Sequence, residues 1–184
     1  ITVPVPTDRR IMVDALMAQM PTCDEVLSAL TVSIAPEGDE PCTIIDRYAT
    51  GIPLTVSIEA AYPAPIEYHW LPSEADSNHP RVARTVLAHC NGVGSTVTVR
   101  CFRQTSGGQL VNLATEQVHR ASHTSSRVQI HGVSSDTSRM NVESLIHIKE
   151  DVCGIKAHQI HKHLLLNQGA RATSEPMLEV LSDD

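Results

Sequence analysis

Aromatic side chains are scarce in this sequence: Phe, Trp and Tyr make up 3% of its 184 residues, although 41% of the residues are hydrophobic. A two-layered globular core usually relies on large rings. A solenoid does not need them, because each turn buries its Val, Ile, Leu and Ala side chains against the next turn. The composition therefore favours a narrow, stacked core, and an ordinary β-sandwich with few aromatics is the alternative.

Long apolar runs and targeting segments are missing as well. No stretch is long enough to cross a bilayer, and the first residues show no secretory leader pattern. The 14 Lys and Arg residues are scattered among 21 Asp and Glu residues, so the net charge is −7, which argues against a nucleic-acid groove. The five Cys residues, an odd number without a C-x-x-C pair, indicate a reducing compartment. We therefore expect a soluble, cytoplasmic protein.

Catalytic signatures are also absent from the sequence. It contains no G-x-S-x-G elbow, no H-E-x-x-H, no Walker A loop and no G-x-G-x-x-G. The acidic residues Glu37, Asp39 and Glu40 lie in a Pro/Gly-containing loop and are expected to be solvated. We therefore predict that the chain is not an enzyme, and we assign no catalytic or cofactor-binding residue.

Short strands separated by polar breaks are the main pattern that is present. Breaks at 134–136, 150–151 and 167–169 fall roughly 16 to 17 residues apart, a spacing typical of the rungs of a β-solenoid. Alternating aliphatic residues between the breaks predict strands, including an extended segment at 158–166 and another at 177–181 after Pro176. Six side chains are expected to point inward: Ile146, Ile148, Ile160, Leu164, Leu166 and Val180.

The first third of the chain has a different texture. Apolar residues at helical spacing predict a short helix within 8–20, and a capping-box pattern at 22–25 predicts a second helix after it. We expect these helices to cover an open end of the solenoid, because unpaired strand edges must be protected. The predicted organisation is a helical cap segment at 1–42 and a β-helix core at 43–184, with the Pro-rich stretch 62–72 as a loop.

Histidine is enriched, with ten residues in the chain. His161 and His163 are two positions apart in a predicted strand, so they project from the same face and can approach one metal ion. Cys153 is a candidate third ligand, although a lone Cys in a strand-rich chain is more often a small buried apolar residue. The alternative is that both His residues occupy ordinary outward-facing polar positions.

A specific combination of motifs lies between residues 141 and 184. Ala157 and Gln159 precede a triple Leu at 164–166, a turn of small residues follows, and the chain then reads P-M-L-E-V at 176–180 and D-D at 183–184. At this spacing the motifs resemble the conserved core of the SufB/SufD family, the paired scaffold proteins of the Suf iron–sulfur cluster assembly system. The resemblance covers roughly residues 110–184, and weaker similarity lies around 43–60 and 80–103.

The resemblance carries several implications for fold and partners. It implies a right-handed parallel β-helix that forms a dimer with a SufB-like chain or with itself and acts with a SufC-type ABC ATPase. The implied cofactor is a transient iron–sulfur cluster shared with the partner. The helices by which family members dock to the ATPase follow a C-S-H-G motif after the Asp pair, and they are not within this sequence.

Individual positions refine this expectation. His161 stands where SufB-type members carry a Cys thought to take part in cluster assembly, so the resemblance favours a SufD-like role. In the family the strand around 177–181 is where two scaffold chains meet, which implies an interface containing Leu178, Glu179 and Val180. Two other functions stay open: a β-helix enzyme acting on carbohydrate, and a degenerate paralogue that serves as an interaction module.

Overall fold

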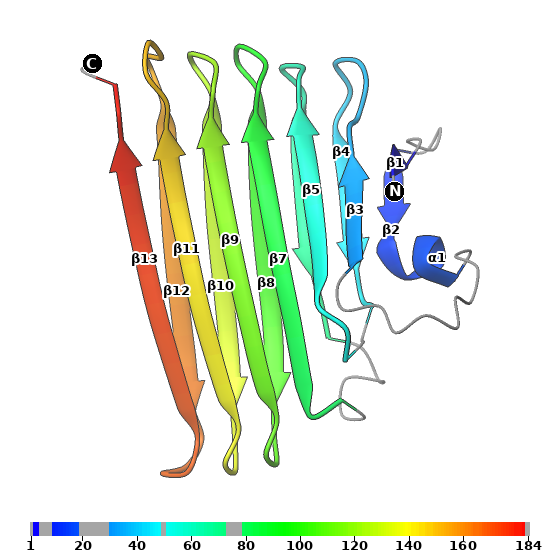
Figure 1. Cartoon of the computed structure of the whole chain (residues 1–184), viewed down its shortest axis with the longest axis vertical. Helices are drawn as coiled ribbons and strands as arrows, with labels where there is room; N and C mark the ends of the chain where they lie inside the picture. Colours follow the sequence, from blue (N-terminus) through cyan, green and yellow to red (C-terminus); the bar gives the residue numbers. More distant parts are fainter. Residues whose placement is uncertain (1, 4–8, 19–29, 49–50, 73–78, 183–184) are drawn as a thin grey trace.

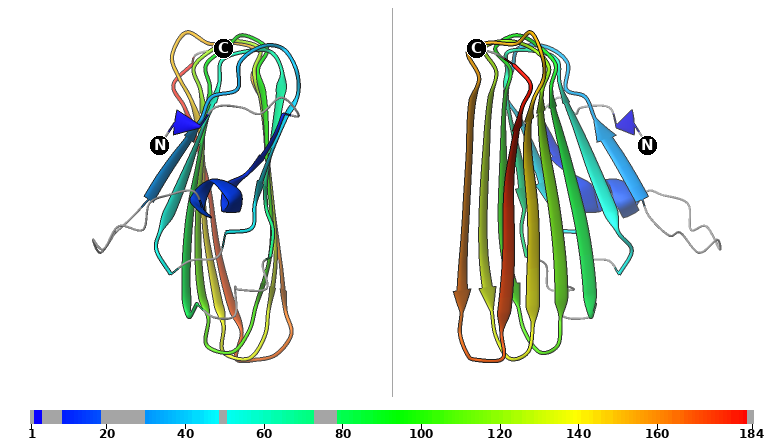
Figure 2. Two further views of the ribbon diagram at one scale, coloured as in Figure 1. Left: turned by 90° about the vertical axis from the view of Figure 1, so that its right-hand side faces the viewer. Right: turned by 60° about the vertical axis from the view of Figure 1, so that its left-hand side comes forward.

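The computed structural model describes residues 2–3, 9–18, 30–48, 51–72 and 79–182. The chain winds back and forth between two parallel sheets that face each other (Figures 1 and 2). The odd-numbered sheet contains β1 (Thr2–Val3), β3 (Leu30–Ile34), β5 (Leu54–Ala60), β7 (Arg81–Cys90), β9 (Leu110–His119), β11 (Arg139–Ile148) and β13 (Arg171–Val180). The even-numbered sheet contains β2 (Arg10–Met12), β4 (Cys42–Asp46), β6 (Pro65–Trp70), β8 (Thr96–Thr105), β10 (Ser125–Ser134) and β12 (Lys156–Leu165).

This architecture is a β-solenoid, as the sequence predicts. Each strand pairs in parallel with the strand two positions later in the chain, for example Leu110 of β9 with Arg139 of β11. One full turn therefore takes about 30 residues and contributes one strand to each sheet. The polar breaks spaced by 16 to 17 residues mark half-turns between opposite sheets, not successive rungs of one sheet, which corrects the interpretation of that spacing.

The core lies between the two sheets and follows from the alternation of buried and more exposed residues along strands β4 to β8 and β10. In β7 and β8 every second residue is buried, including Val86, Ala88, Val97 and Val99. Hydroxyl pairs continue the stacking where the interior is polar, as between Thr115 and Ser144, whose oxygens lie 2.7 Å apart. A stack of small side chains thus replaces the aromatic core of an ordinary two-layered domain.

The few buried aromatics are concentrated in one turn, around an ion pair. Arg84 Nε lies 2.9 Å from Asp46 Oδ2, and both side chains are fully buried. Tyr68 donates its hydroxyl to the same carboxylate oxygen at 2.5 Å, and the Arg84 and Arg103 guanidinium groups lie 5.2 and 4.5 Å from the centre of the Trp70 ring. Burial raises the pKa of Asp46, and Arg84 opposes this shift.

Helix α1 (Val13–Ala18) lies across the opening between the sheets at the N-terminal end (Figure 2). Val13 and Met17 of this helix join the buried core, which agrees with a capping role. The second predicted helix, after the capping-box pattern at 22–25, lies outside the described residues. Strands β2 and β3 pair with β4 and β5, so sheet pairing extends to both sides of residue 43.

Two segment predictions are wrong. The Pro-rich stretch 62–72 contains strand β6, because its prolines flank an alternating Ile66, Tyr68 and Trp70 set that is buried. Strand β13 begins at Arg171 rather than after Pro176, which sits within the ladder opposite Ser144. Proline is tolerated there because β13 is the last strand of its sheet, where a missing N–H leaves no neighbouring strand unpaired.

The predicted inward-facing set is only partly right. Ile146 is buried, and Ile148 and Val180 share its face through the pairing of β11 with β13. Ile160 and Leu164 of β12 instead pair with Gln129 and Val133 on the outer face of β10, and Leu164 is 57% exposed. Leu166, just after β12, is 58% exposed. The expectation for β12 is wrong because Ile160 and Leu164 lie on its outer face.

Among the described residues, no helix has the length and hydropathy needed to span a membrane.

Candidate functional site

The last turn, formed by β12 and β13, is the part of the solenoid whose interior positions are least covered. In β12 the inward face is given by the pairing with β10, which sets Gln159, His161 and His163 beside Val128, Ile130 and Gly132. Val128 and Ile130 are completely buried. The two His residues therefore point toward the space between the sheets, contrary to the alternative that they are outward-facing polar positions.

The ring nitrogens of these two His residues are buried but largely unpaired. His161 Nδ1 lies 2.5 Å from Ser174 Oγ of β13, while His161 Nε2 and both nitrogens of His163 have no hydrogen-bond partner among the described residues. Burial lowers the pKa of both imidazoles, and His163 lowers the pKa of His161 further. Neutral rings with free nitrogens are the form that binds a metal ion.

Gly132 makes room for one of these rings. A Cβ at this position would lie 2.7 Å from His163 Nδ1 and 2.7 Å from Met140 Sδ. The glycine of the preceding turn thus leaves the space that the His163 ring occupies. Sequence reasoning missed this contact. It included Gln159 in the motif but not its contact: the Gln159 amide donates to the Met177 carbonyl across the turn at 3.1 Å.

On the other side of the last turn, β13 presents apolar side chains without cover. Leu178 stacks in register over Ile146 and is 64% exposed, and Val180 stacks over Ile148 and is 49% exposed. Glu179 points to the opposite, outer face, where Glu179 Oε2 lies 3.6 Å from His147 Nε2. The three residues of the implied partner interface therefore divide between the two faces of β13.

The cysteines are placed less favourably for ligation. Cys153 precedes β12 in a turn, where its N–H donates to Ser122 Oγ, and His161 lies in the middle of that strand. Since an extended strand rises about 3.3 Å per residue, the two are well separated along the chain direction. Burial raises the pKa of Cys42, Cys90 and Cys101, so these thiols stay protonated near neutral pH. Within the described ranges, no three His, Cys, Asp or Glu side chains form a group that could hold a metal ion.

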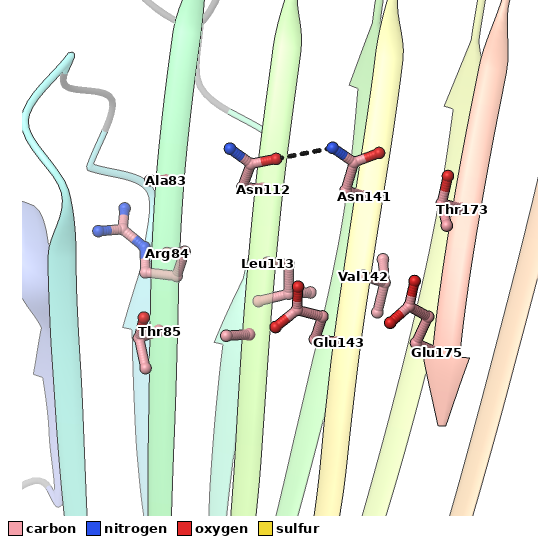
Figure 3. A pocket seen from close by; sticks show the side chains of 11 residues that line it. Ala83, Arg84, Thr85, Asn112, Leu113, Asn141, Val142, Glu143, Thr173 and Glu175 are labelled. Carbon is pink, nitrogen blue, oxygen red and sulfur yellow. Dashed lines mark hydrogen bonds between the residues drawn. The ribbon is translucent and has the colours of Figure 1, made fainter. Parts of the chain in front are cut away.

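A hollow lies on the outer face of the odd-numbered sheet. It has a volume of about 540 Å³ and extends across β7, β9, β11 and β13 (Figure 3). Asn141 donates to Asn112 at 3.0 Å on one side of it, and Glu143 and Glu175 are register partners on the other. Carbohydrate-acting enzymes use paired carboxylates, but both Glu side chains are exposed and like charges on adjacent strands repel. Among the functions left open by the sequence, this hollow concerns the β-helix enzyme that acts on carbohydrate.

The geometry defines a parallel β-solenoid with two inward-facing imidazoles in an uncovered terminal turn, three of whose four ring nitrogens have no hydrogen-bond partner among the described residues. Residues 68–184 match the family model described as SUF system FeS cluster assembly, SufBD core domain. The match covers more than half of the sequence, so the chain belongs to the SufBD family of iron–sulfur cluster assembly proteins. A search of curated proteins finds no match.

Proposed function

We propose that this chain is a SufD-like scaffold subunit of the Suf system, which pairs with a SufB-like chain or with itself and acts in the cytoplasm with a SufC-type ABC ATPase. Membership of the SufBD family supports the general role in iron–sulfur cluster assembly. The SufD-like assignment rests on His161, which replaces the thiolate that a SufB-type chain would offer at this position. Without that thiolate the chain cannot accept a persulfide there.

The observation that carries the proposal is the last turn itself. Its ladder is complete on the side of β10 and β11, but β12 and β13 have no described strand on their other side. Leu178 and Val180 occupy core positions yet are exposed, and exposed apolar clusters of this kind mark interaction sites. A partner turn stacked against β12 and β13 would cover these side chains and satisfy the open ladder groups.

The cluster is the cargo of this assembly, and His161 and His163 are its proposed ligands in this chain. Their unpaired nitrogens lie in the same terminal turn as Leu178. The proposed ligands and the proposed partner-binding surface therefore belong to the same turn. Two imidazoles do not complete the coordination of an iron–sulfur cluster, which is usually held by thiolates. The partner chain therefore supplies the remaining ligands. Cys153 is the candidate thiol of this chain from its sequence, but its separation from His161 along β12 makes it the least favoured of the three ligands.

The experiment is anaerobic reconstitution with iron and sulfide of the complex purified with its partner chain and ATPase. The variant His161→Ala/His163→Ala is expected to lose most of the bound iron while the complex keeps its composition. His131→Ala/His158→Ala is the matched control, because it removes two imidazoles from the outer face of the same sheet, one from β10 and one from β12. The control is expected to keep the iron of the wild type.

Other results would count against particular parts of the proposal. Unchanged iron in the His161→Ala/His163→Ala complex would remove these residues as ligands. A separate Cys153→Ser variant tests whether the thiol takes part. If the chain neither co-elutes with an ABC ATPase nor binds a SufB-like chain, the scaffold role fails and the degenerate interaction module becomes the better account.

A further inference from the structure

The outer face formed by β8, β10 and β12 differs in charge from the chain as a whole. The chain carries a net charge of −7, but no Asp or Glu occurs among the outward positions of β8, β10 and β12. These positions are Thr96, Thr98, Arg100, Phe102, Gln104, Ser125, Arg127, Gln129, His131, Val133, Lys156, His158, Ile160, Lys162 and Leu164. This surface is therefore locally cationic in an acidic protein.

A hollow of about 370 Å³ lies at the beginning of these three strands. Strand pairing arranges its side chains in two rows: Thr96, Ser125 and Lys156 form one, and Thr98, Arg127 and His158 form the other. Strands β8 and β10 thus supply the hydroxyl groups, and strands β10 and β12 supply the basic groups. Since the rows follow the ladder register, the backbone of three strands fixes their spacing.

The basic side chains of this hollow are not neutralised by the protein. Arg127, Lys156 and His158 have no hydrogen-bond or ion-pair partner in the part of the chain that the structure describes. Arg100, two positions further along β8, shows the contrast, because its Nη1 lies 2.8 Å from Glu67 Oε2 and its Nε donates to Gln129. The cations of the hollow are therefore available to an external anion.

We propose that this hollow binds the phosphate group of a small phosphomonoester. Arg127 offers a forked pair of donors that matches two phosphate oxygens, Lys156 adds a point charge, and the hydroxyls of Thr96, Thr98 and Ser125 donate to the remaining oxygen. The volume is at the lower end of the range for ligand pockets and exceeds that of a bare phosphate ion. The rest of the ligand therefore lies along β10 and β12 toward His131, away from Glu67, which neighbours Thr98 on β6.

The test is a titration of the isotope-labelled chain with inorganic phosphate and with glycerol 3-phosphate, followed by amide chemical shifts, with glycerol as the unphosphorylated control. Saturable shifts are expected at 96–98, 125–127 and 156–158 with both phosphate probes and none with glycerol. Arg127→Gln/Lys156→Gln should weaken binding by about tenfold or more, since it removes two charge-assisted contacts.

The matched control is Arg139→Gln/Arg171→Gln, which removes two register-paired cations from the outer face of the opposite sheet. It should leave the affinity within about twofold of the wild type, since surface charges elsewhere act only through a screened field. Shifts that never saturate, shifts spread over both sheets, or equal losses in the two double variants would overturn the proposal. Unchanged shifts outside the hollow show that the substituted chain is folded.

Discussion

Strands β10 and β12 share the same length and an unbroken parallel register, yet they differ in what surrounds them. Every second residue of β10 is buried, whereas no residue of β12 is. The same ladder geometry is therefore built with an apolar interior in the middle turns and with Gln159, His161 and His163 in the last turn. Stacking of the backbone thus specifies this fold, while burial of the inward side chains needs a further turn against them: Leu178 and Val180 occupy core positions yet stay exposed, because no described strand lies beyond β13.

The largest expected effect comes from the buried charge of the closed turns. Arg84→Leu leaves the Asp46 carboxylate without its counter-charge in the core and should lower the free energy of unfolding by about 3 to 5 kcal/mol. His161→Leu in the last turn should change it by less than about 1 kcal/mol, since its side chain is only partly buried. Urea unfolding of both variants checks the contrast.

The double variant Asp46→Leu/Arg84→Leu sharpens this result. Because a hydrophobic pair can replace a buried ion pair at little cost, it should recover part of the stability lost in Arg84→Leu. Equal losses in Arg84→Leu and His161→Leu would contradict the distinction between closed and open turns.

Apolar truncation should show the same contrast at a somewhat smaller size. Ile130 is fully buried in β10, and Ile130→Ala should cost about 2 to 5 kcal/mol of unfolding free energy. Leu164 is 57% exposed on the outer face of β12, and Leu164→Ala should cost less than about 1 kcal/mol. Thermal and urea unfolding measure both; a larger loss for Leu164→Ala would place that side chain in the core after all.

Stability should also depend on pH through His119, a fully buried residue of the closed turns. Its ring nitrogens lie 2.7 Å from Thr124 Oγ1 and 2.9 Å from Ser126 Oγ, and burial lowers its pKa from 6.5 to about 4. The unfolded chain therefore binds a proton that the folded chain excludes, so this stability is complete above pH 6.5 and is lost as pH falls toward 4.

Below both pKa values, the free energy of unfolding should have fallen by about 3 kcal/mol because of His119. Urea midpoints measured between pH 7 and 4 should fall in the wild type and fall less in His119→Gln. Equal slopes for the two proteins would show that other groups carry the pH dependence.

Part of this fold could be predicted from the sequence. Scarce aromatics, alternating aliphatic residues and regular polar breaks predict a β-solenoid, and a helix does cover the N-terminal opening at Val13–Ala18. The prolines of 62–72 concealed β6 because proline is a strong breaker in local patterns, whereas the burial of Tyr68 and Trp70 is decided by neighbouring turns.

The site was predicted less completely, for a physical reason. The spacing of His161 and His163 correctly put them on one face, but a strand has two faces and spacing alone does not say which one is inside. The triple Leu at 164–166 suggested an apolar inner face, while pairing with β10 turns Leu164 outward. The Arg84–Asp46 pair joins residues 38 positions apart, so no local motif could reveal it.

The pairing of two chains through the last turn is tested most directly by their mass in solution. Light scattering of the chain alone at high micromolar concentration, and mixed with a SufB-like chain, should show a two-chain species in at least one sample. Leu178→Asp should abolish that species because it places a charge among the exposed apolar side chains of β13. Val93→Asp is the matched control, since Val93 is 65% exposed and Leu178 is 64% exposed; it should leave the mass unchanged. A one-chain mass in both samples, or equal masses for the two variants, would contradict the account.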